Sequence, residues 1–220
     1  MRNERLRKLV SIGMLCAVAY TVMAVTRIPI SSAEFLKYEP KAVVITIAGF
    51  LYGPMTSFAM AAVVALLEMM TVSTSGPIGC VMNILATASF SCTAAAVYKK
   101  WQTLRGAMAG LVAGTVALTA SMLLWNYFIT PFYMGVPRDV VAGMLMTVFL
   151  PFNLIKGGLD TAFTILLYKP LVLALRKSGL VPPRPDTGAQ KGKMSVGVML
   201  VAVLVLVACV LFVLVQRGVI

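Results

Sequence analysis

Residues 140–175 read VVAGMLMTVFLPFNLIKGGLDTAFTILLYKPLVLAL, and this long apolar stretch decides the fold class of the chain. A hydrocarbon core of about 30 Å asks for roughly 20 apolar residues in an α-helix, so the stretch is more than long enough to cross a bilayer. Pro151 lacks a backbone donor and clashes with the preceding turn, which predicts a bend within one long helical region. We therefore expect an all-α integral membrane protein.

Outward from this stretch, the rest of the chain repeats the pattern of apolar runs between short polar turns. Sixty per cent of the residues are apolar and 12% are charged, too few to cover a soluble domain of this size with polar surface. One run, residues 42–52, is short for a crossing and ends at Gly53-Pro54. The predicted helices are residues 9–28, 42–52, 55–70, 78–98, 106–129, 140–175 and 194–215.

The boundaries predict three parts. Residues 1–177 are expected to form a six-helix substrate-binding membrane domain. Residues 178–193 are rich in Pro, Gly and Lys, as expected of a cytoplasmic linker that does not pack. Residues 194–216 are uniformly apolar and predict an additional transmembrane helix.

The net charge of +12 is concentrated in three basic clusters that alternate with the apolar runs. Basic residues gather on the cytoplasmic side of membrane helices, so the pattern favours a multi-pass protein of the cell membrane with a cytoplasmic N-terminus. Nucleic acid binding is the poorer interpretation of this charge. The clusters hold Arg2, Arg5, Arg7 and Lys8; Lys99, Lys100 and Arg105; and Lys169, Arg176, Lys177, Arg184, Lys191 and Lys193.

Several chemistries lack their usual residues. The chain has no histidine, the commonest general base and metal ligand. Its four cysteines lie in apolar runs without a CxxC pair, which favours a role as small core residues over a metal or redox site. No GxxxxGK[ST] loop occurs, so energy for transport would come from partners or a gradient. We expect no catalytic residues, no metal and no cofactor.

Polar side chains inside apolar runs are costly and are therefore candidates for function. Asn153, Lys156 and Asp160 lie one turn apart on one face of the predicted sixth helix. A central Lys or Asp costs about 2.5–3.5 kcal/mol on insertion scales. The alternative to a functional role is a structural one, in which Lys156 and Asp160 neutralise each other. A simple ion pair, however, does not need a third polar residue on the same face.

Other candidates lie towards the outer ends of the predicted helices. The Asn126 amide can donate and accept, which suits the edge of a heterocycle, although Trp125 and Tyr127 equally suit an interfacial aromatic belt. Glu68 and Asn83 flank an external turn, where Glu68 could simply snorkel or cap a helix. The polar and aromatic loop at residues 31–41 is either a lid over a cavity or a solvated connector.

Five motifs, in order and at plausible spacing between about residues 5 and 177, resemble the riboflavin-specific S components of energy-coupling factor (ECF) transporters. Each is weak alone, and together they are fairly specific. They are FLKYEPK at 35–41, GFLYGP at 49–54, GPIG at 76–79 before Met82-Asn83, NYF at 126–128 before a proline, and PFNLIK at 151–156.

This resemblance implies a six-helix substrate-capture subunit with an external cavity for riboflavin, which is transported and is no cofactor. Such subunits associate with a transmembrane coupling protein and two cytoplasmic ATPases. Small residues on the first helix form the coupling surface of the family, which here implies Gly13 and Ala17. The helix after residue 193 departs from the six-helix pattern. The vitamin contacts of the family map onto Leu36, Tyr38, Glu39, Asn126, Asn153 and Lys156.

Three rival interpretations stay open at this point. One is an S component for a different vitamin or a purine-like heterocycle, because side chains of the cavity and not the scaffold set the substrate. Another is a membrane enzyme, which would need convergent acids or a metal cluster. The third is a membrane protein that only assembles with others, in which case Asn153, Lys156 and Asp160 would be costly without purpose.

Overall fold

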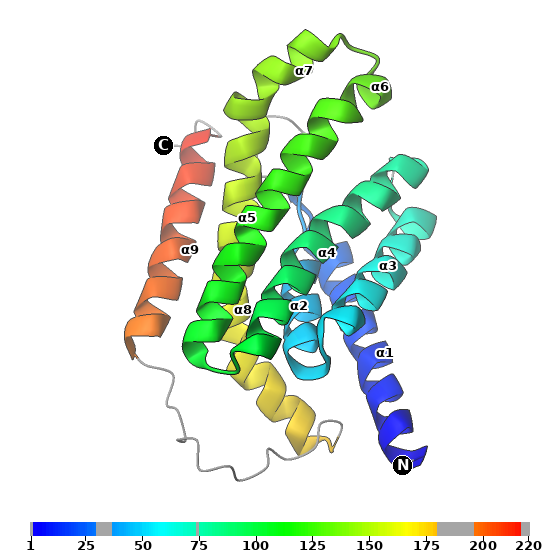
Figure 1. Ribbon diagram of the computed structural model, residues 1–220, viewed down its shortest axis with the longest axis vertical. Coiled ribbons are helices and arrows are strands. Elements are labelled where there is room, and N and C mark those ends of the chain that lie inside the picture. Colours follow the sequence, from blue (N-terminus) through cyan, green and yellow to red (C-terminus); the bar gives the residue numbers. More distant parts are fainter. Residues whose placement is uncertain (1, 30–36, 74, 180–195, 217–220) are drawn as a thin grey trace.

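The computed structural model describes residues 2–29, 37–73, 75–179 and 196–216, and these form a bundle of long helices (Figure 1). Within the described residues, 6 helical segments are long and apolar enough to cross a membrane. The prediction of an all-α membrane bundle with an additional C-terminal helix is confirmed. The segments are α1 (Arg2–Val25), α3 (Pro54–Thr71), α4 (Gly76–Lys100), α5 (Leu104–Phe128), the continuous segment Arg138–Lys177, and α9 (Val196–Gln216).

The short helix α2 (Lys41–Tyr52) is the centre of the bundle. All residues from Lys41 to Gly49 are buried, because α1, α3, α4 and α8 (Leu150–Lys177) surround the helix. Its side chains enter three apolar clusters: one with α1 and α3 around Leu15 and Met60, one with α8 at Val172, and a third with α4 and α5 through Ala42. A central helix meets protein and not lipid, so it is free to be shorter than the bilayer is thick.

The chain reverses between α2 and α3 at Gly53-Pro54, as the sequence predicted. Gly53 has a φ of 97°, a left-handed backbone value that a residue without Cβ adopts most readily. Pro54 then opens α3, where its missing N–H is not needed by the helix. On the other side of the bundle, α4 and α5 pack through Phe90, Leu111 and neighbouring residues.

The predicted bend at Pro151 takes the form of a π-helical turn. α6 (Thr130–Met134) and α7 (Arg138–Met144) follow α5, and the π segment Leu145–Phe149 then runs directly into α8. Pro151 lies in the first turn of α8, where a proline is tolerated. The wider π turn absorbs the lost backbone hydrogen bond without ending the helix, which continues to Lys177.

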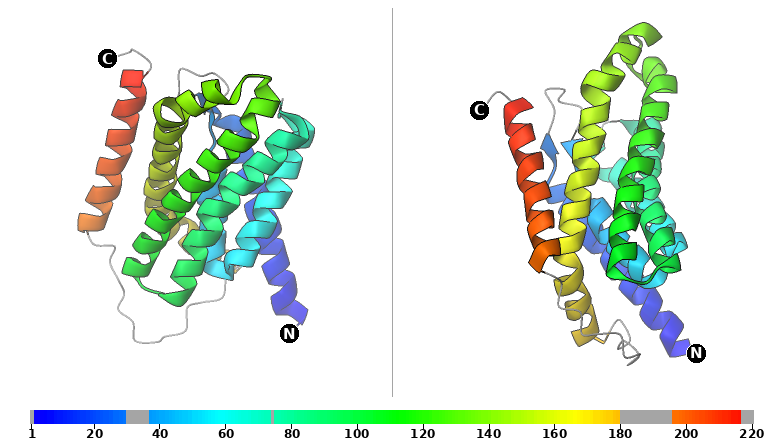
Figure 2. Two further views of the ribbon diagram at one scale, coloured as in Figure 1. Left: turned by 45° about the horizontal axis from the view of Figure 1, so that its top comes forward. Right: turned by 60° about the vertical axis from the view of Figure 1, so that its left-hand side comes forward.

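A two-residue antiparallel ladder, which the sequence analysis did not predict, follows α1. β1 (Ile28–Pro29) pairs with β2 (Lys37–Tyr38), with Ile28 opposite Tyr38. The ladder lies beside α8 at the end of the bundle opposite the start of α1 (Figure 2). It therefore brings β2 against the helix that carries the predicted polar face.

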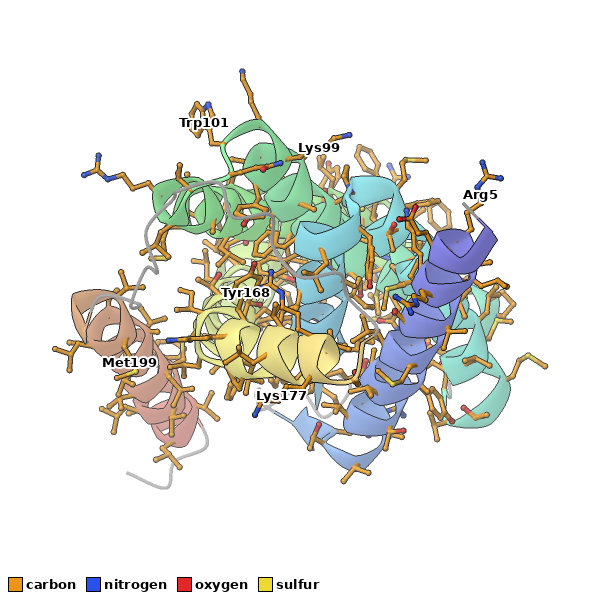
Figure 3. All side chains as sticks on the ribbon, turned by 90° about the horizontal axis from the view of Figure 1, so that it is seen from below. Arg5, Lys99, Trp101, Tyr168, Lys177 and Met199 are labelled. Carbon is orange, nitrogen blue, oxygen red and sulfur yellow. The ribbon has the colours of Figure 1, made fainter. Side chains whose placement is uncertain are left out.

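Described members of the three basic clusters lie at one end of the molecule. Seen from that end, labelled members of each cluster, Arg5, Lys99 and Lys177, lie on the same face (Figure 3). This distribution is the one that the positive-inside pattern predicts for a cytoplasmic face. Residues 30–36 of the loop and residues 180–195 of the predicted linker lie outside the described residues.

Candidate functional site

A cluster of paired charges joins the ends of four helices at the side of the bundle away from the start of α1. Arg27, just after α1, reaches Glu39 (Nε–Oε1 3.1 Å) and Glu68 (Nη2–Oε1 2.9 Å). Lys41, at the start of α2, reaches Glu39 (Nζ–Oε2 2.7 Å) and also pairs with Glu68 of α3. Asn83 of α4 donates to Glu68 (Nδ2–Oε1 2.9 Å). We call Arg27, Glu39, Lys41, Glu68 and Asn83 the charge cluster.

Opposite charges stabilise the ionised form of Glu39 within this cluster. Burial alone would raise the pKa of the Glu39 carboxyl, but Lys41, Lys156 and Arg27 together hold it below the ordinary value of 4.5. Glu39 is therefore a carboxylate at neutral pH. Lys156, which belongs to α8, is one of the cations that act on Glu39, and the hydrogen bond of the adjacent Tyr38 to Asp160 places the charge cluster next to the polar face of that helix.

The polar face of α8 is buried in the bundle. Asn153, Lys156 and Asp160 are exposed by only 3%, 7% and 0%. Asp160 accepts a hydrogen bond from the Tyr38 hydroxyl (2.9 Å), which ties β2 to α8. Within the described residues, Lys156 makes no hydrogen bond and no ion pair within 4.0 Å, so a direct pair between Lys156 and Asp160 is not formed.

Tyr38 is held on α8 by packing as well as by its hydroxyl. Its side chain is buried and lies in an apolar cluster with Phe152, Ile155 and Leu159. Its ring also stacks near Phe163, with centroids 6.5 Å apart. Burial, followed by the neighbouring Asp160 carboxylate, raises the pKa of Tyr38, so the hydroxyl stays protonated and donates.

The two predicted asparagines form hydrogen bonds with residues four positions away along the chain. Asn126 donates to the Met122 carbonyl (2.7 Å), and its Oδ1 accepts from Thr130 (2.8 Å). Asn153 donates to the Phe149 carbonyl (2.8 Å), at the end of the π turn. Across the described part of the chain, the Asn153 Oδ1 has no hydrogen-bond donor, so this side chain keeps an acceptor available.

The structure thus brings together part of the predicted set. Tyr38 and Glu39 approach Lys156 and Asp160 of α8, whereas Asn126 stands on α5 with no hydrogen bond to those residues in the described part of the chain. Leu36 lies outside the described residues. The sequence analysis missed Arg27 and Lys41 as binding partners of Glu68. The cost of a buried charge would have indicated Lys41, had its helix been expected to begin at residue 41 and not 42.

Comparison with known proteins decides the family. The family described as "ECF transporter, substrate-specific component" matches residues 7–168 of the chain. The chain belongs to this family. The match includes the β1–β2 ladder, the charge cluster and the polar face of α8, and it ends before α9. The prediction of a transport subunit and not an enzyme is confirmed.

Individual relatives of this S component agree. It is 31% identical over 184 residues to "Riboflavin transporter RibU" of Staphylococcus aureus, covering 80% of this chain and 96% of the relative. It is 30% identical over 178 residues to "Riboflavin transporter FmnP" of Bacillus subtilis, covering 74% and 91%. A solved structure titled "Structure and mechanism of the S component of a bacterial ECF transporter" superimposes with a TM-score of 0.67 at 31% identity, covering 78% of this chain and 99% of that one.

The predicted coupling residues of this S component lie on an open face. Gly13 and Ala17 are exposed on α1, on the side away from the buried Leu15 and Ala19. A Cβ at Gly13 would meet nothing within 4 Å in the described structure. Small residues of this kind allow another helix to approach closely.

Proposed function

We propose that this S component captures riboflavin on the outer side of the cell membrane and imports it together with an ECF coupling protein and two ATPases. The relatives named riboflavin transporters support this substrate, because the identities of 31% and 30% extend over nearly their whole lengths. The observation that carries the proposal is Lys156. A buried cation with no hydrogen bond and no ion pair within 4.0 Å among the described residues is costly in a membrane and is retained when a guest uses it.

The charges around Lys156 favour an uncharged guest. Three cations stand against three carboxylates, so no excess of positive charge is available for a phosphate. Riboflavin is neutral, and its ring offers an apolar face and an imide edge with carbonyl oxygens. We assign Lys156 as a donor to such an oxygen and Asn153 as an acceptor for the imide N–H. The balanced groups are Arg27, Lys41 and Lys156 with Glu39, Glu68 and Asp160.

The remaining assignments follow from position. Tyr38 and Glu39, with Leu36 before them, would cover the guest from the β2 side, and Asn126 would contact it from α5. The basic end of the bundle would face the cytoplasm, which makes the N-terminus cytoplasmic. The exposed Gly13 and Ala17 would then form the contact with the coupling protein in the membrane.

Quenching of flavin fluorescence by the purified protein tests the proposal. We expect saturable quenching by riboflavin, weaker quenching by FMN, and loss of affinity in Lys156→Ala. Leu154→Ala is the matched control, because Leu154 lies on the same helix with 48% of its surface exposed. Absence of quenching by the wild type would sink the riboflavin assignment, and equal affinities in the three proteins would remove Lys156 from the site. Co-purification with coupling and ATPase subunits tests the transport assembly separately.

A further inference from the structure

Helix α9 is the part of the structure that the family match leaves unexplained. The match ends at residue 168, and α9 begins at Val196. The Staphylococcus aureus relative is covered to 96% while a fifth of this chain stays outside the alignment. In both Figures 1 and 2, α9 lies along α8 at the edge of the bundle. It is therefore an addition to the shared fold that packs on the helix carrying the polar face.

One narrow face of α9 makes this contact. Val198, Ala202, Val205, Cys209 and Val213 recur every three or four residues and so lie on one side of the helix. Ala202 is exposed by only 1%, whereas the opposite side is open to lipid. The open side carries Leu200, Leu204 and Leu211.

Gly158 of α8 sets how closely the two helices approach. A Cβ at this position would lie 3.0 Å from the Cys209 Sγ and 3.8 Å from Val205 Cγ1. A Cβ alone is already in tight contact there, so a side chain as large as leucine must push α9 away from α8. Gly158 lies two residues after Lys156 and two before Asp160, at the level of the candidate site.

The C-terminal half of the contact between α8 and α9 reaches the candidate site itself. Cys209 and Val213 pack in the same apolar cluster as Tyr38, Leu159 and Phe163. The hydroxyl of Tyr38 is bonded to Asp160. Tyr38 is thus held by α8 through a hydrogen bond and covered by α9 through apolar contact, and it is exposed by only 3%.

We propose that α9 is a side wall of the substrate site, which holds β2 against α8 and slows release of the substrate. For β2 to move away from α8, Tyr38 must break its bond to Asp160 and leave the apolar cluster that α9 completes. Docked α9 therefore opposes opening of the site at this flank. This inference rests on the proposed function for the identity of the substrate, but the restraint on Tyr38 is a property of the free protein.

Displacing α9 is the first test. Gly158→Leu should force α9 off α8, and Gly143→Leu is the control, because a Cβ at the exposed Gly143 meets nothing within 4 Å. In the free full-length protein, we expect faster hydrogen exchange at residues 37–39 in Gly158→Leu and unchanged exchange in α4. With riboflavin, we expect dissociation about tenfold faster, equivalent to about 1.4 kcal/mol.

The second test is a reversible disulfide between α8 and α9. It does not require the protein to fold with a bulky residue at position 158. A disulfide of about 2.05 Å places each sulfur about 3 Å from the Cβ of its partner, which is the separation found between position 158 and Cys209. Oxidised Gly158→Cys should therefore join α8 to α9. We expect slower exchange at residues 37–39 and slower flavin release than in the reduced protein. Gly158→Cys combined with Cys209→Ala should not respond to oxidation.

The outcomes separate the two proposals. If the wild type binds no flavin, the proposed function fails, while exchange at residues 37–39 still decides the role of α9. If neither displacement nor locking of α9 changes that exchange, the side-wall inference is overturned. If exchange responds but flavin dissociation from a binding-competent protein does not, α9 restrains Tyr38 without retaining the substrate, and the inference is likewise overturned.

Discussion

Two groups of buried charge lie side by side in this protein and differ in how fully they are paired. In the charge cluster, the single carboxylate of Glu68 is contacted by three side chains, those of Arg27, Lys41 and Asn83. On the polar face of α8, the described structure provides no hydrogen-bond partner for Lys156 or for the Oδ1 of Asn153. We call the first group saturated, because each of its charges has an ion-pair partner, and the second unsaturated, because Lys156 has none among the described residues. A saturated network joins elements, whereas an unsaturated one has capacity to bind. The comparison assigns stability to the first group and recognition to the second.

The largest expected effect is on the stability of the saturated group. Glu68→Leu leaves Lys41 and Arg27 short of a carboxylate in a buried place, and breaking a buried pair in this way costs about 3 kcal/mol or more. We expect a clear fall in the thermal unfolding midpoint in detergent. Glu4→Leu, at an exposed position of α1, should leave the midpoint nearly unchanged. A stable Glu68→Leu protein would contradict the structural role of the cluster.

The next effect concerns the unsaturated group, where we expect a loss of riboflavin affinity without a loss of stability. Lys156→Met keeps the length of the side chain and removes its charge. Because a hydrogen bond to a charged group is worth about 1.5–3 kcal/mol, riboflavin affinity should fall roughly tenfold to a hundredfold. The unfolding midpoint should stay equal or rise, since an unpaired buried charge is lost. A large fall in the midpoint, measured beside a fluorescence titration, would move Lys156 into the structural group.

A smaller effect distinguishes the two asparagines. Asn153→Ala removes an available acceptor, and a neutral hydrogen bond of about 1 kcal/mol corresponds to roughly a fivefold loss of riboflavin affinity. Asn126→Ala should have less effect, because its Oδ1 is already occupied by Thr130. Titration of both variants beside Leu124→Ala, a substitution of an exposed neighbour on α5, measures the order. The reverse order would show that Asn126 turns towards the substrate.

The smallest effect is a dependence of stability on pH. The folded pKa of Glu39 lies below its ordinary value of 4.5, so the unfolded chain takes up a proton first as the pH falls. The stabilisation from Glu39 is therefore complete above about pH 4.5 and is lost below it. Unfolding midpoints between pH 6 and pH 3 should fall less steeply in Glu39→Gln than in the wild type. Parallel curves would exclude this contribution.

Sequence predicted the scaffold closely and the site in part. Hydrophobic run length fixes a membrane helix, so most predicted helices lie within about two residues of the observed ones, as for residues 78–98 against Gly76–Lys100. The exception is the first helix, predicted at residues 9–28, because α1 begins at Arg2, within the basic cluster. The burial cost of polar groups likewise indicated Asn153, Lys156 and Asp160. Pairing between distant segments has no such signal. The contact of Tyr38 with Asp160 spans 122 residues, and nothing local distinguishes it from the alternative pair of Lys156 with Asp160.

The shortness of α2 has a mechanical consequence. At about 1.5 Å per residue, its 12 residues extend roughly 18 Å, well short of a hydrocarbon core of about 30 Å. The chain just before it, residues 37–40, is not helical, and Tyr38 and Glu39 are buried there against the neighbouring helices. Irregular backbone is tolerated beside a bilayer core only where protein shields it from lipid. A change of conformation in residues 37–40 would therefore take place between helices, without exposing unpaired peptide groups to the hydrocarbon core.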